Sequence, residues 1–460
     1  MGGFSVGEAH DRAKESLGHG MPMYTWYVVL LLALINAVNY MDRMVLSVLS
    51  PQIKRDLDLS DAQLGLLVGF AFSVFYAICG IPVARWADRG SRRNIITIAL
   101  ATWSGMTALS GAAQNFWHLF LTRVGVGAGE AGCFPTAGSL LCDYIPFQRR
   151  AGIYALLNVG LAVGLMIGVG LGGWLGDAIG WRMTFVALGI PGITLAMIVR
   201  LTLREPTRGV LDGKPAASVA ATGQPSIGST VTTLWGCRTY RLLVLFFVAT
   251  GFVNFGLAQW WPSLYERVSG LSMSSIGVYL GGAIGAGSMV GLLTGGWLAD
   301  RVGRKDARLP LIYGAATTSC AIPSAIGSLY VSSVHGSMVL VALSVLLWSV
   351  PLGAAMAAMY SVTAARIRAT AGAIATFLAS ILGAGLGPLC VGLLSDALAP
   401  LHGAEGLRHA LLAPIAVLPV TVIALAAAAR HLLADLVDSA GPNDDGEIAA
   451  TRAIRAVAAR

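Results

Sequence analysis

The sequence predicts an all-α membrane protein with about twelve transmembrane helices, arranged as two six-helix halves. Three observations lead to this fold class: the composition, a regular succession of long apolar stretches, and an internal repeat. Of the 460 residues, 56% are hydrophobic and 12% are charged. The charged fraction is about half that of a typical soluble domain, so the apolar surplus is expected to face lipid.

Apolar stretches long enough to cross a bilayer, about 20 residues each, recur along the whole chain. In the first half, the expected helices cover residues 24–49, 62–83, 94–113, 116–142, 150–175 and 183–203. In the second half, they cover residues 239–264, 274–298, 309–331, 337–360, 369–394 and 407–430. We therefore expect five parts: a cytoplasmic N-terminal segment (1–23), a six-helix half (24–203), a cytoplasmic linker (204–238), a second six-helix half (239–430) and a cytoplasmic tail (431–460).

The distribution of basic residues predicts that both termini are cytoplasmic. With the N-terminus inside, 24 of the 31 Lys and Arg residues fall in cytoplasmic segments, and only five fall outside. This asymmetry follows the positive-inside rule for multi-pass proteins, here of a cell inner membrane. It accounts for the formal net charge of +8 without a nucleic-acid partner.

The two expected halves share a loop sequence. After the second expected helix the chain runs Ala84-Arg85-Trp86-Ala87-Asp88-Arg89-Gly90-Ser91-Arg92-Arg93. After the eighth it runs Gly296-Trp297-Leu298-Ala299-Asp300-Arg301-Val302-Gly303-Arg304-Lys305. The two Asp-Arg pairs are 212 residues apart, close to half the chain length. Two like halves around a central loop are typical of secondary transporters.

These loops resemble the signature of the major facilitator superfamily. The second copy fits that signature fully, whereas the first shifts its glycine by one place and has Ala84 instead of the leading glycine. The run Arg123-Val124-Gly125-Val126-Gly127 resembles the second motif of the family. The fifth helix resembles the antiporter motif but carries Val169 in place of its proline, which leaves antiport open. The resemblance covers about residues 24–430 and implies secondary active transport by alternating access.

Within the superfamily, three segments resemble the Spinster-type transporters: Asn39-Tyr40-Met41-Asp42-Arg43, Gly129-Glu130-Ala131-Gly132-Cys133-Phe134-Pro135 and Arg204-Glu205-Pro206-Thr207-Arg208-Gly209. That group is associated with export of lysolipids and sphingolipid phosphates. The resemblance therefore implies a lipid-like or amphiphilic anionic substrate of the lysolipid or sphingoid phosphate type. The first segment and the Arg/Glu pair of the fourth helix also resemble proton-coupled sugar-acid symporters. A proton-coupled symporter of a small organic or sugar acid is therefore the alternative.

Four charged residues stand inside expected spans, all in the first half: Asp42, Arg43, Arg123 and Glu130. A charge at the centre of a membrane helix costs about 2.5–3.5 kcal/mol, so such residues are expected to pair or to line a wet cavity. Arg123 and Glu130 are seven residues apart and share one helix face. From the expected helix ends, Asp42 and Arg123 lie about 10 Å below the outer edge, and Glu130 lies about 10 Å deeper.

Two interpretations of this cluster stay open. In the first, it is a proton switch with Glu130 as the main carrier and Asp42 as the second. Burial and a neighbouring guanidinium act in opposite directions on the proton affinity of a carboxylate, so opening the cavity to either side would change it. Arg43 and Arg123 would then hold the ionised carboxylates or bind an anionic headgroup. In the second interpretation, the charges are static pairs that fix helix packing.

The remaining candidate residues concern substrate binding and conformational change. The expected substrate cavity combines residues of the first helix with polar and aromatic residues of the second half: Asn36, Asn39, Tyr40, Asn254, Gln259, Tyr279, Trp348 and Tyr360. The repeated loops are expected to form a conformational latch between the halves, which would favour the outward-open state and break on inward opening: Asp88, Arg89, Arg92, Asp300, Arg301 and Arg304. The alternatives are an interfacial aromatic belt and charges that only set the topology.

Other function classes are disfavoured by the sequence. An enzyme would need a nucleophile with a base within reach, and no expected span places a histidine near a serine or cysteine. The six cysteines are scattered singly without metal-type spacing. We thus predict no catalytic residues, no cofactor and no metal. Twelve spans and two like halves argue against a channel or receptor. The expected partners are the lipid bilayer, an amphiphilic or organic anion and protons, with a monomer as the working state.

Overall fold

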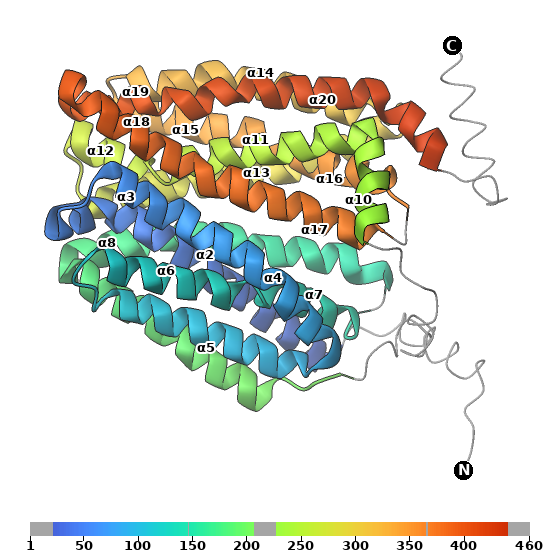
Figure 1. Cartoon of the computed structure of the whole chain (residues 1–460), viewed down its shortest axis with the longest axis horizontal. Helices are drawn as coiled ribbons and strands as arrows, with labels where there is room; N and C mark the ends of the chain where they lie inside the picture. The colour runs from blue at the N-terminus through green and yellow to red at the C-terminus, as the bar shows by residue number, and fades with distance from the viewer. Residues whose placement is uncertain (1–21, 146, 207–226, 365–366, 440–460) are drawn as a thin grey trace.

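The computed structural model describes residues 22–145, 147–206, 227–364 and 367–439, and these fold into helices without strands. The helices run roughly side by side in two bundles, one from blue to green and one from yellow to red (Figure 1). Residues 440–460 of the expected tail (431–460) and residues 207–226 of the expected linker (204–238) lie outside the described residues. Within the linker region, the described part forms a short helix, α10 (Ile227–Gly236).

The first bundle contains six crossings. Its elements are α2 (Met23–Leu57), α3 (Asp61–Gly65), the π-helical turn η1 (Leu66–Phe70), α4 (Ala71–Arg89), α5 (Arg92–Ser110), α6 (Phe116–Glu130), α7 (Cys133–Cys142) and α8 (Phe147–Thr202). Helix α8 crosses twice, because the chain turns at Gly180, whose φ of +75° belongs to the left-handed region that favours glycine.

The second bundle follows α10. Its elements are α11 (Arg238–Ala258), α12 (Trp261–Ser269), α13 (Met273–Gly303), α14 (Leu309–Tyr330), α15 (Val334–Ser349), α16 (Pro351–Ser361), α17 (Arg368–Leu378), η2 (Ala379–Gly385), α18 (Leu386–His402), η3 (Gly403–Glu405), α19 (Gly406–Ala410) and α20 (Leu412–Ser439). The last helix continues nine residues past its expected end at residue 430.

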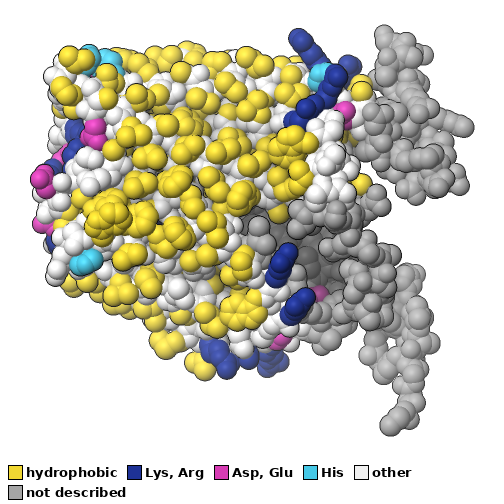
Figure 2. Space-filling view, viewed as in Figure 1, with side chains coloured by type: hydrophobic (Ala, Val, Ile, Leu, Met, Phe, Trp, Pro, Cys, Tyr) yellow, Lys and Arg dark blue, Asp and Glu magenta, His cyan; other side chains and the backbone are white. Residues whose placement is uncertain are grey.

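Length and hydropathy mark eight described stretches as able to cross a membrane. Two of them, residues 160–202 and 370–436, are 43 and 67 residues long and each hold two crossings. The less apolar α5 and the interrupted pair α6–α7 supply two more, which completes the expected twelve. Hydrophobic side chains cover the middle of the molecule, and charged side chains gather at its two ends (Figure 2). Large apolar side chains such as Leu121, 63% exposed, therefore face lipid.

Prolines explain where several expected helices are interrupted. A proline inside a helix removes the hydrogen bond to the carbonyl four residues earlier. Pro135 does so at Ala131, where α6 gives way to α7 directly after Glu130. Pro262 does so at Ala258, the last residue of α11. The freed carbonyl of Ala258 and the carbonyl of Gln259 accept hydrogen bonds from the Ser47 hydroxyl of the other half, at 3.4 and 2.7 Å.

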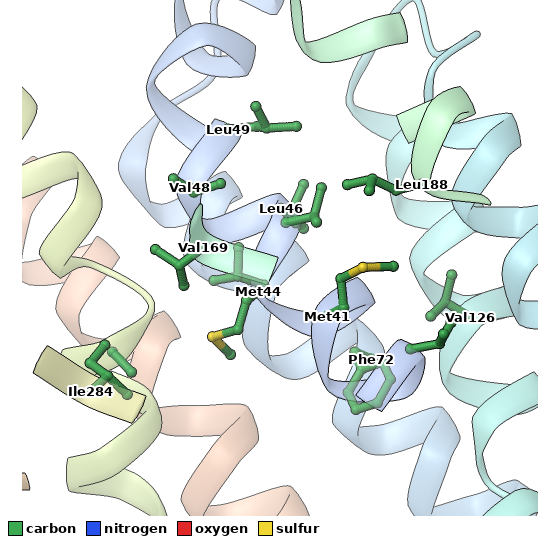
Figure 3. Packing of buried hydrophobic residues seen from close by; sticks show 14 of the residues in the cluster. Met41, Met44, Leu46, Val48, Leu49, Phe72, Val126, Val169, Leu188 and Ile284 are labelled. Carbon is green, nitrogen blue, oxygen red and sulfur yellow. The ribbon is translucent and has the colours of Figure 1, made fainter. Parts of the chain in front are cut away.

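Glycines bring α8 into direct backbone contact with α2. A Cβ added at Gly160, Gly164 or Gly168 would lie 2.5, 2.3 or 2.7 Å from carbonyl oxygens of α2. Small residues at this spacing are the usual means of close helix packing in membranes. Met44 of α2 lies beside Val169 of α8, whereas Met41 points toward Phe72 and Val126 (Figure 3). The middle of α2 is thereby fixed rigidly against α8.

The hydrogen bonds that join the two halves cluster at one end of the molecule, which we call the paired end. It lies at the left of Figure 1, where α3, α12 and α19 meet. Asp61 accepts both Nη groups of Arg267, at 2.7 and 2.6 Å, together with Lys54 and the Ser395 hydroxyl. Asp396 accepts the backbone N–H groups of Asp61 and Ala62 at 3.0 and 2.8 Å. The opposite end, with residues 85–93, 202–206 and 300–308, is called the linker end.

Candidate functional site

An ion pair between Arg43 and Glu130 lies at the centre of the first half. Arg43 comes from α2, and Glu130 is the last residue of α6 before the interruption made by Pro135. The Arg43 Nε and Nη2 groups each lie 2.8 Å from Glu130 Oε2. The Glu130 side chain is fully buried, whereas 14% of the Arg43 side chain is exposed. Within this pair, the Glu130 carboxylate is therefore shielded from solvent, and only the Arg43 side chain is partly accessible.

Aromatic rings surround the Arg43 guanidinium. Its Cζ atom lies 5.1, 4.5 and 5.0 Å from the ring centroids of Tyr40, Phe72 and Tyr76. Arg123 lies 5.7 Å from the ring of Phe72. Cation–π contacts of this kind gain strength when they are desolvated. The rings hold both cations in place without neutralising them.

Asp42 and Arg123 form the second part of the cluster. Asp42 is fully buried, and its Oδ2 accepts the Thr107 hydroxyl at 3.4 Å, while Oδ1 has no hydrogen-bond partner. Arg123 is 1% exposed, with Nε and Nη1 unpartnered, and interacts electrostatically with Asp42, Glu130 and Arg43. Two carboxylates and two guanidinium groups thus balance in charge, but several of their polar atoms lack hydrogen bonds. Buried polar atoms without partners are rare in static structures.

The expected end of the first helix is corrected by the length of α2. This helix ends at Leu57 rather than at residue 49. Fifteen residues, or about 22 Å of helix, therefore separate Asp42 from the helix end instead of seven. Asp42 and Arg43 lie near the middle of the 35-residue helix.

A central cavity of about 240 Å³ lies between the halves, and Arg43 and Arg123 both line it. The first half contributes Tyr40, Arg43, Val68, Phe72, Ser73, Tyr76 and Arg123. The second half contributes Phe247, Gly251, Phe255, Gln259, Met356, Ala375, Thr376, Ala379, Ser380 and Ala384. The charges are on one side and a largely apolar wall is on the other.

A second cavity of about 30 Å³ lies behind the Arg43–Glu130 pair. Glu130 lines this cavity and is not part of the wall of the central one, whereas Arg43 and Tyr76 line both. The remaining lining residues are Leu32, Ile35, Asn36, Asn39, Cys133, Ala137, Gly138 and Leu157. The Arg43–Glu130 ion pair therefore lies between the central cavity and the smaller second cavity.

The structure separates the expected substrate residues into two groups. Tyr40 and Gln259 line the central cavity, and Asn36 and Asn39 line the second cavity. The other four do not reach the central cavity wall, contrary to the expectation: Asn254, Tyr279, Trp348 and Tyr360. Polarity alone therefore does not decide which side chains line the central cavity.

Three of these four residues have other neighbours. Tyr279 is 40% exposed, with its ring 5.4 Å from that of His335. Trp348 stacks in parallel on Trp261 at 6.3 Å. Tyr360 belongs to a packed cluster in the second half and lies against Gly372. Phe72 and Tyr76 also line the central cavity, although they are not among the expected substrate residues. Their four-residue spacing places them on one helix face, which is the pattern that would have predicted them.

The expected latch residues do not meet across the halves. Arg92 binds within the first half, to Asp143 and to Glu205, whose Oε1 lies 2.8 Å from its Nε. Arg301 lies 5.5 Å from the ring of Trp297 on its own helix, and Arg89, Asp300 and Arg304 are exposed. The Asp88 side chain lies outside the described residues. In this structure the halves are joined instead at the paired end.

Glu205 is the acceptor that organises the linker end of the first half. Besides Arg92, it accepts the Ser91 hydroxyl at 3.0 Å and the backbone N–H of Arg93 at 2.8 Å. Partial burial raises the pKa of Glu205, but these hydrogen bonds outweigh it, so the pKa lies below the ordinary 4.5. The carboxylate stays ionised at neutral pH and stabilises the start of α5.

Comparison with known proteins agrees with this architecture. The family model of the Major Facilitator Superfamily matches residues 32–441. An MFS-type efflux pump of Mycolicibacterium smegmatis is 34% identical over 402 residues, covering 86% of this chain and 90% of the relative. A hexuronate transporter of Bacillus subtilis is 27% identical over 384 residues, covering 82% of this chain and 89% of the relative. Among solved structures, a bacterial homolog to the human lysosomal transporter Spinster, inward-facing and unoccupied, is 31% identical with a TM-score of 0.81, covering 90% of this chain and 99% of that one.

Proposed function

The chain belongs to the Major Facilitator Superfamily, and we propose that it couples protons to the movement of an amphiphilic organic anion. It is a membrane transporter and not an enzyme. The proposal rests on one observation, which is that Arg43 both binds Glu130 and lines the central cavity. A substrate anion and the Glu130 carboxylate therefore compete for the same guanidinium.

This competition supplies the coupling. When Glu130 is ionised, Arg43 is held at Oε2 by a hydrogen bond from Nε and by an ion-pair contact from Nη2. Protonation of Glu130 removes the charge that holds Arg43, so the guanidinium becomes available for an anion in the central cavity. An anion that binds Arg43 conversely leaves Glu130 as an uncompensated buried carboxylate, which favours its protonation. Each ligand thus changes the affinity for the other, as linkage requires.

Asp42 and Arg123 are proposed as the second proton-coupling pair. Arg123 interacts with both carboxylates, so the loss of charge on one carboxylate changes how strongly it holds the other. Arg123 also lines the central cavity and can contact the same anion as Arg43. Two guanidinium groups on one wall suit a phosphate or carboxylate headgroup.

The second half supports an amphiphilic substrate, of the lysolipid or sphingoid phosphate type. Its contribution to the cavity consists mainly of Phe247, Phe255, Met356 and alanines, with Gln259 as the large polar residue. An anionic headgroup would lie against the two arginines, and apolar carbons would lie against this wall. The Spinster homolog of known structure supports the same assignment of subfamily.

A proton-coupled symporter of a small organic or sugar acid remains the second candidate. A cavity of about 240 Å³ with both arginines in its wall suits a compact acid, and the Bacillus relative is a hexuronate transporter. The amphiphile is favoured because the wall that the second half contributes offers only three hydroxyl-binding side chains, Gln259, Thr376 and Ser380, among ten lining residues. A sugar acid needs several such partners.

The proposed orientation places the linker end and both chain termini in the cytoplasm of a cell with this protein in its inner membrane. The basic residues at the linker end support it through the positive-inside rule. In this orientation the paired end closes the outer side, as in an inward-facing state. The charged cluster and both cavities are completed within one chain, which supports a monomeric unit.

Transport assays in proteoliposomes with an imposed pH gradient test the proposal. Labelled lysolipid, sphingoid phosphate and sugar acid are compared for the wild type, Glu130→Gln and the control Glu405→Gln, an acidic residue in a peripheral pair with Arg408. We expect gradient-dependent amphiphile movement that Glu130→Gln loses and Glu405→Gln retains. Movement of sugar acid alone would establish the second candidate. A Glu130→Gln variant that is driven by the gradient as well as the wild type would refute Glu130 as the proton carrier.

A further inference from the structure

Glu130 faces away from the space in which the substrate is expected to bind. Its Oε2 atom is taken by Arg43, and its Oε1 atom is buried without a hydrogen bond. Its side chain lines the second cavity and not the central one. A buried carboxylate oxygen is normally satisfied by protein or by water, so the second cavity is the place where a partner of Oε1 has to lie.

The second cavity has the size and chemistry of a water site. Its volume of about 30 Å³ gives room for one or two water molecules, since about 10–15 Å³ is needed for each. Asn36 and Asn39 supply polar groups from α2. The Asn39 amide interacts with the Glu130 carboxylate but does not bond Oε1 directly. A water molecule between two such groups replaces a direct hydrogen bond at little energetic cost.

The position of the cavity indicates the direction of access. From Arg43, its lining residues on α2 continue toward the start of that helix, as far as Leu32. From Glu130, those on the following helix continue through Cys133 to Ala137, toward the end of α7. Both directions lead to the linker end. The central cavity lies on the other side of Arg43 and Tyr76, which line both spaces.

We propose that the second cavity holds water bonded to Glu130 Oε1, positioned by Asn39, and that protons reach Glu130 through it from the linker end without crossing the substrate cavity. This inference rests on the proposed function, in which Glu130 carries the proton. The water passes a proton to Oε1 and takes up another from the linker end, and the neutral carboxyl then releases Arg43 into the central cavity. The proton returns to water by the reverse step when Arg43 comes back to Oε2.

The groups that face Glu130 fit this route. They are Arg43 and Asp42 on α2, Tyr76 on α4, Arg123 on its own helix and Cys133 on α7. No carboxylic acid other than Glu130 lines the second cavity, and Tyr76 and Cys133, which do line it, are weak acids that do not readily give up a proton at neutral pH. Water is therefore the proton donor on that side.

The test compares variants that alter one cavity at a time. Asn39→Leu removes the amide at similar volume, and Ala137→Leu fills the second cavity from α7. Ser73→Leu alters only the central cavity. Each is measured in proteoliposomes for gradient-driven uptake and for exchange at equal pH, with labelled lysophosphatidylglycerol or galacturonate, whichever the wild type moves. Infrared difference spectra of a pH titration, without substrate, report the carbonyl band of protonated Glu130, assigned by its loss in Glu130→Gln.

We expect Asn39→Leu and Ala137→Leu to lower gradient-driven uptake at least tenfold while exchange stays within twofold. The carbonyl band should move to higher wavenumber in both, because protonated Glu130 loses its hydrogen bond to water. Ser73→Leu should change exchange without moving the band. This inference is wrong if the carbonyl band of Asn39→Leu and Ala137→Leu stays in place and their gradient-driven uptake equals that of the wild type. If Glu130→Gln loses gradient-driven uptake in the same experiment, the proposed function stands. If Glu130→Gln is driven normally and its spectrum shows no lost band, the proposed function fails first.

Discussion

Arg267 of the second half binds Asp61 of the first through both of its Nη groups, at 2.7 and 2.6 Å. Asp61 is almost fully buried, and its carboxylate also accepts hydrogen bonds from Lys54 and from the Ser395 hydroxyl. The same residue begins α3, whose first backbone N–H groups are accepted by Asp396 of the second half. The paired end is thus closed by reciprocal contacts, each of which has to break before the cavity can open on that side.

The first prediction concerns this contact. Arg267→Gln should shift the molecule toward opening at the paired end by about 1.5–3 kcal/mol, the usual range for hydrogen bonds to a charged group. Spin labels at Asp58 and Ala404, both exposed and in different halves, would report the shift as longer distances in pulsed electron resonance. Arg55→Gln is the matched control, since Arg55 pairs with Glu266 but its side chain is 62% exposed. Exposed pairs contribute about 0–1 kcal/mol, so equal shifts in both variants would contradict the assignment.

The second prediction uses a double-mutant cycle on the central ion pair. Arg43→Gln leaves Glu130 as an unpaired buried carboxylate and should destabilise the protein by about 3–5 kcal/mol at neutral pH. The double variant Arg43→Gln/Glu130→Gln removes both charges and should recover much of that loss. Thermal unfolding of purified protein in detergent measures all four corners of the cycle. Additive losses would mean that the two residues do not act as a pair.

The third prediction tests the backbone contact that positions Arg43. Gly164→Ala would place a Cβ 2.3 Å from the Ala37 carbonyl and should cost about 1–3 kcal/mol, as overpacking does. Gly282→Ala is the control, because no atom lies within 4 Å of its added Cβ. That substitution should be neutral or stabilise by up to about 1 kcal/mol through the unfolded state. Unfolding temperatures that fall equally in both variants would argue against the close packing of α2 and α8.

Much of the fold was predictable from the sequence because apolar length alone determines a crossing. The helix interruptions were less predictable: Pro135 and Pro262 lie at two of them, but Pro51, Pro82 and Pro323 lie inside continuous helices. The four buried charges identified the cluster, but not that Arg43 binds Glu130, which is 87 residues away on a helix whose rotation no local pattern determines.

The wall of the central cavity was less predictable than the charged cluster. Polarity selected Tyr279 and Trp348, yet one faces outward and the other stacks on Trp261. Burial of a charge in a membrane is costly enough to indicate a role, whereas a tyrosine or tryptophan is tolerated on any helix face. The contacts at the paired end, such as that of Asp61 with Arg267, depend on the conformation, and the sequence analysis did not predict them.

The fourth prediction follows from the finding that Gln259 lines the central cavity whereas Tyr279 does not. Gln259→Leu removes a polar group of the central cavity wall and should raise the KM of transport about tenfold, with less effect on the maximal rate. Tyr279→Leu should leave KM within twofold, because Tyr279 lies outside that wall and is 40% exposed. Concentration dependence of uptake in proteoliposomes gives both values. A large KM change in Tyr279→Leu alone would return Tyr279 to the substrate site.

The fifth prediction concerns the pH dependence of the linker end. Because the pKa of Glu205 lies below its ordinary value of 4.5, ionised Glu205 stabilises the folded state. This contribution is fully present above about pH 4.5 and is lost as the pH falls through the lower pKa of the folded state. Glu205→Gln should therefore be less stable than the wild type by about 1–2 kcal/mol at pH 7, a discounted value because Glu205 is partly exposed. The two proteins should converge in unfolding temperature as the pH falls from 4.5 through the lower pKa of Glu205 in the folded state. A stability difference that persists unchanged at pH 3.5 would mean that the ionised carboxylate is not what binds Arg92 and the start of α5.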